Sequence, residues 1–254
     1  MLAPDTVHAW LIRLDVKADE SQLARWREWL SVMERAKADI FRAEQHRREY
    51  ITSHAALRVV LGECLGIAPA DVIFDDGRDA GAKPHLLIAG DKPDVRFNLS
   101  HTAGAALIGV TLDWELGVDI ERLRPMADLE AMARSVMSME EFDRWLEVET
   151  GAQELAFYRL WTRKESYLKA IGLGLYRSLQ QVTVSVSPEM QTGGERVRDL
   201  SDDANWMVSD VTVPAGFSAS IFSASICCEG VEMPEIRMAE LDPATGFKIR
   251  NVRR

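Results

Sequence analysis

Two carboxylates stand two positions apart in the otherwise apolar stretch LGVDIERL, residues 116–123. If this stretch is a strand, Asp119 and Glu121 share one face, because successive strand side chains point to opposite sides. Like charges held together oppose one another's ionisation, and a divalent cation removes that penalty. Mg²⁺ prefers a few carboxylates together with waters and substrate phosphates. The spacing suits a magnesium site, and equally an edge strand whose polar face lies in water.

A third carboxylate comes from the predicted helix FYRLWTRKESYLKA, residues 157–170. Trp161, Glu165 and Lys169 follow one another at intervals of four residues, so they lie along one stripe of the helix. A surface Glu–Lys pair is the ordinary explanation of this spacing, and it contributes only a few tenths of a kcal/mol. If the helix packs beside the Asp-x-Glu strand, Glu165 instead adds a third hard oxygen ligand.

The segment FNLSHTAGAALIG, residues 97–109, places Ser100 and His101 near the end of a predicted strand. The small residues that follow let backbone N–H groups approach an anion, and Ser and His can donate to phosphate. An ordinary turn with a solvent-facing histidine is the alternative. A hydrolase triad is not expected, because adjacent strand residues face apart and no GxSxG motif is present.

Basic residues gather on the predicted helix ERAKADIFRAEQHRREY, residues 34–50, although the chain as a whole is acidic. Lys37 and either Arg47 or Arg48 could bind a multiply phosphorylated nucleotide, as could Lys83 of the Lys-Pro dipeptide. A solvated helix face is the usual explanation of such a run. No P-loop occurs, and no GxGxxG motif follows a strand, so neither an ATPase nor a Rossmann dehydrogenase is expected.

The elements that must position these residues follow from hydrophobic periodicity. Helices are predicted at residues 18–42, 44–66, 128–148 and 153–172, and strands at 8–16, 116–123, 179–187, 205–213 and 217–227. Two further strands are predicted within 95–112, around SHTAGA, and a strand, a turn and a short strand within 70–88. Each half of the chain contains a long helix that ends at a glycine and leads into a strand, at Gly66 and at Gly172.

We therefore expect an α+β protein, a pseudo-dimer of two similar α/β lobes. Each lobe would be a small, mainly antiparallel sheet packed on a long helix. The N-terminal lobe would cover residues 1–112, and the C-terminal lobe, with the metal site, residues 113–228. An irregular tail would cover residues 229–254. Because one chain supplies both lobes, we expect a monomer.

Composition narrows the function classes. The chain has 254 residues, 47% of them hydrophobic, and a formal net charge of −10, which argues against nonspecific nucleic-acid binding. Its three cysteines, Cys64, Cys227 and Cys228, show no CxxC spacing, so we expect reduced thiols in a cytoplasmic protein. Neither a signal peptide nor an apolar run of membrane-spanning length is visible, so no membrane association is expected.

Three segments together resemble a known family. FNLSHTAG, GVDIERLRP and FYRLWTRKESYLKAIGLGL occur in this order and resemble the signature segments of 4′-phosphopantetheinyl transferases of the two-lobed Sfp type. The resemblance runs from about residue 10 to about residue 228. It implies an active site in the cleft between two lobes. It also implies transfer of the phosphopantetheine arm of coenzyme A to a carrier-protein serine, with release of 3′,5′-ADP.

The resemblance also implies roles for the matching residues. Asp119, Glu121 and Glu165 would bind Mg²⁺. Glu165, or a metal-bound water beside it, would accept the proton of the carrier serine, because phosphoryl transfer needs positioning and charge neutralisation more than a protein nucleophile. Lys169, one turn along the helix, would neutralise or protonate the leaving 3′,5′-ADP oxygen.

Coenzyme A would be held by Ser100 and His101, with His101 at the 3′-phosphate. Its phosphates would also meet basic side chains, namely Lys83, Lys37 and, of the two neighbouring arginines, Arg48. One position departs from the family, because some relatives place a basic residue where this sequence has Glu34. The family pattern therefore leaves open which basic side chains of residues 34–48 contact the phosphates.

The sequence leaves open two rival functions and the surface that would receive a carrier protein. A non-catalytic coenzyme A or nucleotide binder would not need both the three carboxylates and Lys169. A phosphohydrolase would be expected to show further metal ligands or a histidine cluster, whereas the five histidines are scattered. Carrier proteins of this type are acidic, so an apolar surface at Met132, Val136 and Met137 could receive one, unless these side chains belong to the core.

Overall fold

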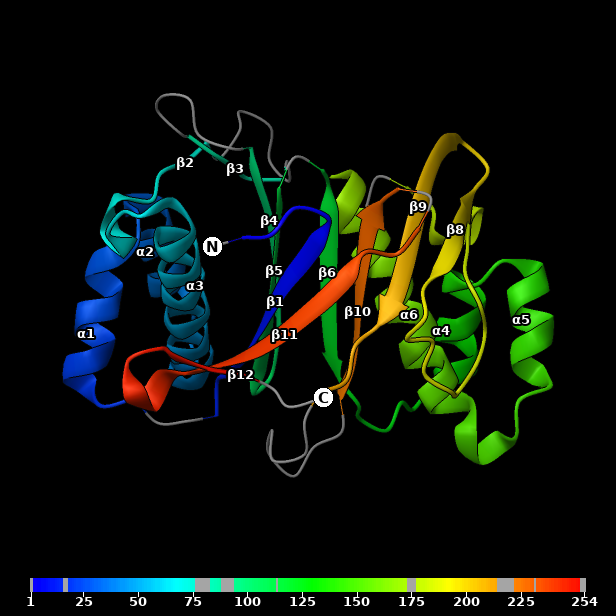
Figure 1. Ribbon diagram of the computed structural model, residues 1–254. Coiled ribbons are helices and arrows are strands. Elements are labelled where there is room, and N and C mark those ends of the chain that lie inside the picture. The colour runs from blue at the N-terminus through cyan, green and yellow to red at the C-terminus, as the bar shows by residue number, and fades with distance from the viewer. Residues whose placement is uncertain are drawn as a thin grey trace.

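Two five-stranded sheets lie side by side at the centre of the molecule, and helices pack at both outer ends (Figure 1). The computed structural model describes residues 2–15, 18–75, 83–87, 94–112, 114–172, 177–213, 222–230 and 232–251. The mixed α+β architecture is confirmed. Among the described residues, no helix combines the length and apolarity needed to cross a membrane.

The first sheet has the strand order β12-β11-β1-β5-β4. Its strands are β1 (Thr6–Arg13), β4 (Val95–Thr102), β5 (Ala105–Leu112), β11 (Glu235–Asp242) and β12 (Lys248–Asn251). It is covered by α1 (Glu20–Trp29), α2 (Val32–Ile40) and α3 (Glu44–Leu65). A separate two-stranded ribbon joins β2 (Phe74–Asp75) to β3 (His85–Leu86), after the short helix η1 (Pro69–Asp71).

The tail was expected to be irregular, and this prediction is wrong for residues 235–251. Strand β11 pairs in parallel with β1, and β12 follows through the short helix η5 (Pro243–Thr245). Ile236 and Met238 pack toward the second sheet, whereas Leu241 packs toward the helices of the first. Charged and apolar residues alternate along much of β11, a period of two that is typical of a strand with one covered face and that was missed in the sequence.

Two predicted helices are each divided in two by a capping serine. The Ser31 hydroxyl accepts from Glu34 N at 3.2 Å, and Glu34 Oε2 accepts from Ser31 N at 2.7 Å. Ser138 and Glu141 form the same reciprocal pair, at 3.2 and 2.8 Å. Each pair satisfies backbone groups that a helix start leaves free, so a new helix begins there.

The second sheet has the order β6-β10-β9-β8-β7. Its strands are β6 (Leu116–Arg122), β7 (Val182–Thr183), β8 (Glu195–Asp199), β9 (Asp202–Asp210) and β10 (Phe222–Glu229). The helices beside it are α4 (Leu129–Val136), α5 (Met139–Leu146), η2 (Thr150–Ala152), α6 (Gln153–Ile171) and η4 (Leu179–Gln181). The strand predicted at 179–187 shrinks to η4 and β7, and the start of the one predicted at 217–227 lies outside the described residues.

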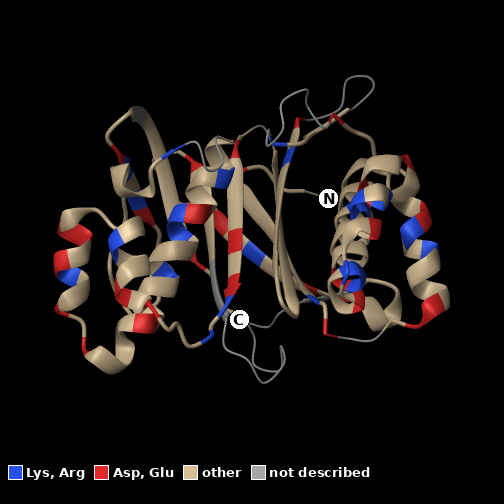
Figure 2. Ribbon diagram, turned by 180° about the vertical axis from the view of Figure 1, so that it is seen from behind, with Lys and Arg blue, Asp and Glu red and all other residues tan. Residues whose placement is uncertain are grey.

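Three apolar clusters hold these layers together. One fills the space between the first sheet and α1–α3, and another lies between α4–α6 and the second sheet. The third joins the two sheets to each other, with Leu107 of β5 and Val118 of β6 fully buried at its centre. Acidic and basic residues are interspersed over both helical layers (Figure 2), so neither layer presents a face of one sign.

Candidate active site

Helix α6 lies directly against β6 because Gly117 has no side chain. A Cβ atom at Gly117 would stand 2.0 Å from Ser166 O and 2.4 Å from Ala170 N, both on the helix backbone. The same helix carries Glu165 and Lys169, while Asp119 follows Gly117 on the strand. The close approach permitted by the glycine therefore brings the predicted carboxylates and the predicted lysine to one place.

Asp119 is the most enclosed of these groups, with 2% of its surface exposed. Its Oδ1 accepts a hydrogen bond from Ser100 Oγ at 2.9 Å and a close contact from Lys169 Nζ. Lys169 Nζ also donates to Ser100 Oγ at 2.8 Å. Ser100, Asp119 and Lys169 thus form a triangle of mutual contacts between β4, β6 and α6.

Two buried carboxylate oxygens at this place lack a partner among the described residues: Asp119 Oδ2 and Glu165 Oε1. Buried polar atoms are almost always satisfied, since leaving one unpaired costs about 1–3 kcal/mol and more for a charged group. A cation bound between the carboxylates would satisfy both atoms. The donor set of Asp119, Glu121 and Glu165 consists of the hard oxygen ligands that Mg²⁺ prefers, so these residues fit the ion.

The electrostatics of the cluster point the same way. Burial, followed by the charge of Asp119, raises the pKa of Glu165, and the nearby Lys169 ammonium only partly opposes this. Burial and Asp119 likewise raise the pKa of Glu121. Glu121 and Glu165 are therefore harder to ionise than isolated carboxyl groups, and further positive charge among them would oppose the shift.

The Lys169 ammonium supplies part of this positive charge. Among the residues that the structure describes, no three His, Cys, Asp or Glu side chains converge closely enough to form a ready-made cation site. The ammonium of Lys169 sits on Asp119 instead, and 30% of the lysine side chain is exposed. Because its stem is long and flexible, the lysine can withdraw toward solvent or toward a substrate phosphate.

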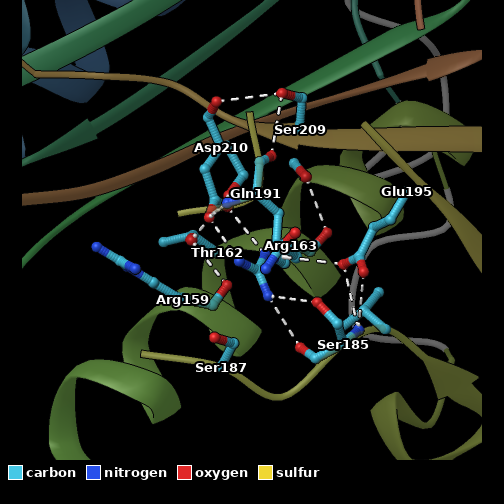
Figure 3. Close-up of polar contacts among 12 residues, drawn as sticks. Arg159, Thr162, Arg163, Ser185, Ser187, Gln191, Glu195, Ser209 and Asp210 are labelled. Carbon is cyan, nitrogen blue, oxygen red and sulfur yellow. Dashed lines mark hydrogen bonds and ion pairs between the residues drawn. The ribbon is translucent and has the colours of Figure 1, made fainter. Parts of the chain in front are cut away.

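Two buried cations on α6 fix the helix behind this cluster. The Arg163 guanidinium donates to Asp210 of β9 and, at 2.9 Å, to the carbonyl and hydroxyl oxygens of Ser185 (Figure 3). Lys164 Nζ lies 2.5 Å from Glu141 Oε2 and 3.0 Å from Val136 O. Because removing one partner of a buried ion pair is strongly destabilising, these contacts hold α6 in place.

A cavity of about 430 Å³ lies between β4 and the helices α2 and α3. It is lined by Met33, Glu34, Lys37, Tyr50, His54, Leu57, Phe74, Pro84, Phe97, Asn98 and Leu99. The His101 ring centroid lies 6.4 Å from that of His54, which places His101 at the cavity's border. The mostly apolar and aromatic lining with a few polar groups is typical of a small-molecule site.

The polar groups of this cavity are tuned by burial. Burial, then the charges of Lys169 and Lys37, lowers the pKa of His101, so its imidazole is neutral at pH 7. Burial lowers the pKa of His54 to about 4. His54 stacks on Tyr50 with ring centroids 3.8 Å apart, and its Nδ1 donates to the Tyr50 carbonyl oxygen at 2.9 Å. Lys37 Nζ lies 5.6 Å from the Tyr50 ring centroid.

The departure at Glu34 has a structural explanation. Glu34 Oε2 accepts from Arg58 Nε at 3.1 Å and Nη2 at 2.6 Å, while it also caps the start of α2. Arg58 is 2% exposed and donates further to Val72 O at 2.7 Å. Glu34 therefore ties α2 to α3, and Lys37 is left as the cation of α2 that lines the cavity.

Two predicted phosphate contacts are not brought into this cavity. Arg48 Nη1 lies 2.5 Å from Glu20 Oε1 and lines a different cavity of about 390 Å³. Lys83 Nζ contacts Glu115 Oε2 at 2.5 Å and Leu116 O at 2.8 Å, so it joins the start of β6. Burial lowers the pKa of Lys83, with Glu115 opposing. Phosphate binding by either residue stays a prediction.

The predicted carrier-docking surface is largely buried, and several residues near the site were not predicted. Val136 and Met137 are core residues, with 3% and 2% exposure, so of the two alternatives for this surface the core one holds for them, whereas Met132 is exposed. Tyr50 and His54 were missed as site residues, although they lie on the helix that was predicted at residues 44–66. Asn98 and Thr102, the residues two positions before and after Ser100, were also missed.

The chain was compared with known proteins. The family model of the 4′-phosphopantetheinyl transferase superfamily matches residues 115–221. The chain is 36% identical over 187 residues to the 4′-phosphopantetheinyl transferase HetI of Nostoc sp., covering 74% of this chain and 77% of the relative. It is 29% identical to the transferase psf-1 of Bacillus pumilus (70% and 73% covered) and 27% identical to Sfp of Bacillus subtilis (72% and 79% covered). The chain therefore belongs to the 4′-phosphopantetheinyl transferase superfamily and is of the Sfp type.

Proposed function

We propose that this protein transfers the 4′-phosphopantetheine arm of coenzyme A to a serine of a carrier protein and releases 3′,5′-ADP. Membership of the family supports the reaction class. The observation that carries the site assignment is the pair of buried oxygens of Asp119 and Glu165 that have no partner among the described residues, next to the Lys169 ammonium. Phosphoryl transfer depends mainly on positioning and charge neutralisation, which this cluster is suited to supply.

Asp119, Glu121 and Glu165 would hold Mg²⁺, with Lys169 released from Asp119. When bound, the ion would neutralise charge on the pyrophosphate of coenzyme A. Ser100 would keep Asp119 oriented through its 2.9 Å hydrogen bond. Lys169, freed from the carboxylate, would reach the phosphate of the leaving 3′,5′-ADP.

The carrier serine is the nucleophile in this scheme. Its oxygen forms a bond to the phosphorus that carries the pantetheine arm, and the bond from that phosphorus to the 3′,5′-ADP oxygen breaks. The serine proton passes to the Glu165 carboxylate, directly or through one water, at the oxygen that does not hold the metal. Lys169 donates to the leaving oxygen as negative charge develops there.

The cavity beside β4 would receive the nucleotide end of coenzyme A. Its apolar lining suits an adenine ring, and Lys37 supplies positive charge for a phosphate. His101, neutral and at the border of the cavity, would donate one N–H to the 3′-phosphate. Asn98 of β4 lines the cavity and Ser100, two residues further on, bonds to Asp119, so one bound coenzyme A would reach along β4 from the cavity to the carboxylates.

We also propose that the chain is a pseudo-dimer with its active site in the cleft between two lobes. Three strands of the first sheet, in the order β1-β5-β4, correspond to three of the second, in the order β6-β10-β9. In the chain, α3 lies between β1 and β4, and α6 lies between β6 and β9. Residues 235–251 would then belong to the N-terminal lobe because β11 extends its sheet. A monomeric state and a cytoplasmic location stay predictions.

The test is to incubate the protein with coenzyme A, MgCl2 and an apo carrier domain. We expect the carrier to gain the mass of about one phosphopantetheine arm and the solution to accumulate 3′,5′-ADP. Coenzyme A binding without any mass gain on several carriers would favour the non-catalytic binder instead. Hydrolysis of coenzyme A without a carrier would favour the phosphohydrolase.

A further inference from the structure

The two sheets meet at their edges through side chains rather than through a backbone ladder. Strand β4 lies at one edge of the first sheet and β6 at one edge of the second. In β6, antiparallel pairing with β10 uses alternate backbone groups, so the amides of Val118, Ile120 and Arg122 are left to face β4. Buried amides need a partner, and an open strand edge needs cover.

Side-chain oxygens of β4 satisfy these amides one after another. Val118 N donates to Asn98 Oδ1 at 3.0 Å, and Ile120 N donates to Ser100 Oγ at 3.4 Å. Arg122 N donates to Thr102 Oγ1 at 3.4 Å. Each bond spans 20 residues, so the strands run side by side in parallel with a constant register. We name Asn98, Ser100 and Thr102 the β4–β6 ladder.

The two hydroxyl groups of the ladder also donate to the carboxylates of the site. Ser100 Oγ donates to Asp119 Oδ1 at 2.9 Å, and Thr102 Oγ1 donates to Glu121 Oε2 at 3.1 Å. A hydroxyl that accepts from a fixed amide has its proton directed to its other neighbour. Thr102 thus fixes one oxygen of Glu121 and leaves Oε1 available.

We propose that Thr102 is a positioning residue of the transferase centre, which acts by holding the Glu121 carboxylate in the orientation that binds the metal. This inference rests on the proposed function and adds a residue to it. Thr102 acts through Glu121 rather than on the substrate. Phe97 and Leu99, which alternate with the ladder residues along β4, line the cavity. One strand therefore fixes the position of the cavity relative to the carboxylates.

The experiment compares Thr102→Val, which removes the hydroxyl at nearly constant volume, with Thr102→Ser, which keeps it. Thr111→Val is the matched control: Thr111 is a buried threonine of β5 whose hydroxyl donates to Trp114 O at 2.7 Å. Rates are measured at varied MgCl2 with saturating carrier, and separately at varied coenzyme A. The rise in melting temperature that MgCl2 produces with coenzyme A bound gives a readout that does not depend on turnover.

We expect Thr102→Val to raise the MgCl2 concentration for half-maximal rate about tenfold, with little change in KM for coenzyme A. It should also weaken the stabilisation by MgCl2, whereas Thr102→Ser and Thr111→Val should resemble the parent protein. An unchanged MgCl2 requirement in Thr102→Val, or the same loss in Thr102→Ser, would overturn the proposal. If Thr102→Val does not fold, Thr102→Ala deletes the same hydroxyl and is judged identically. An inactive parent protein would refute the proposed function instead.

Discussion

Replacement of Gly117 by alanine tests how the site is assembled. The added Cβ would lie 2.0 Å from Ser166 O, so the backbone of α6 must retreat by about 1.4 Å to regain ordinary contact at 3.4 Å. Helix backbone cannot rotate away as a flexible side chain can. Overpacking of this kind costs about 1–3 kcal/mol, and we expect Gly117→Ala to lie near 3 kcal/mol.

The same retreat would carry Glu165 and Lys169 away from Asp119. A displacement of about 1 Å in a positioned catalytic group can reduce the rate about 100-fold, so we expect a loss of that size in transfer rate even where the protein is folded. Stability would be measured by urea unfolding, and transfer by the mass gain of an apo carrier.

Gly151→Ala provides the control, because a Cβ at Gly151 would meet nothing within 4 Å. We expect this variant to change the free energy of unfolding by no more than about 0.5 kcal/mol and to retain full transfer activity. If Gly117→Ala matched Gly151→Ala in both measurements, the helix would not be held against β6 as described, and the account of how the carboxylates meet would be refuted.

Three further predictions concern single side chains. Asp119→Asn should lower transfer about 100-fold or more with folding intact by circular dichroism, and near-normal transfer would remove Asp119 from the metal site. His101→Ala should raise KM for coenzyme A more than it lowers kcat, whereas an unchanged KM would place His101 outside the coenzyme A site. Because His54 has a pKa of about 4 when folded and an ordinary value of 6.5, the unfolded chain binds its proton first as the pH falls. Stability should therefore decline from pH 6.5 to about pH 4, by about 3 kcal/mol through this group, and urea unfolding of His54→Asn should show a smaller decline.

Much of the site could be predicted from sequence because its residues lie in regular elements. Strand and helix periodicities place Asp119 with Glu121, and Glu165 with Lys169, each on one face. The helix ends at Gly66 and Gly172 were also correct, since both adopt the left-handed conformation that glycine tolerates. Spacing could not show that the Lys169 ammonium would contact Asp119 directly.

The failures have a common cause in long-range pairing. Arg48 was predicted to contact phosphate, but its guanidinium donates to Glu20 Oε1 and to the carbonyl oxygen of Ala18, just before α1. Glu34 stands where some relatives have a basic residue, and the sequence did not show that it forms an ion pair with Arg58, 24 residues further along the chain. The ladder residues Asn98, Ser100 and Thr102 occupy alternate positions of β4. This period of two is visible in the sequence, but its role depends on the open edge of β6 beside it.

The pairing of β11 with β1 has a consequence for synthesis of the protein. Thr6 stands opposite Glu235, so the first sheet pairs two strands that lie more than 200 residues apart in the chain. Such distant contacts slow folding, and until they form one edge of β1 stays open to other chains. Completion of the first sheet must therefore wait for β11 to leave the ribosome, whereas β4 and β5 can pair with each other much earlier.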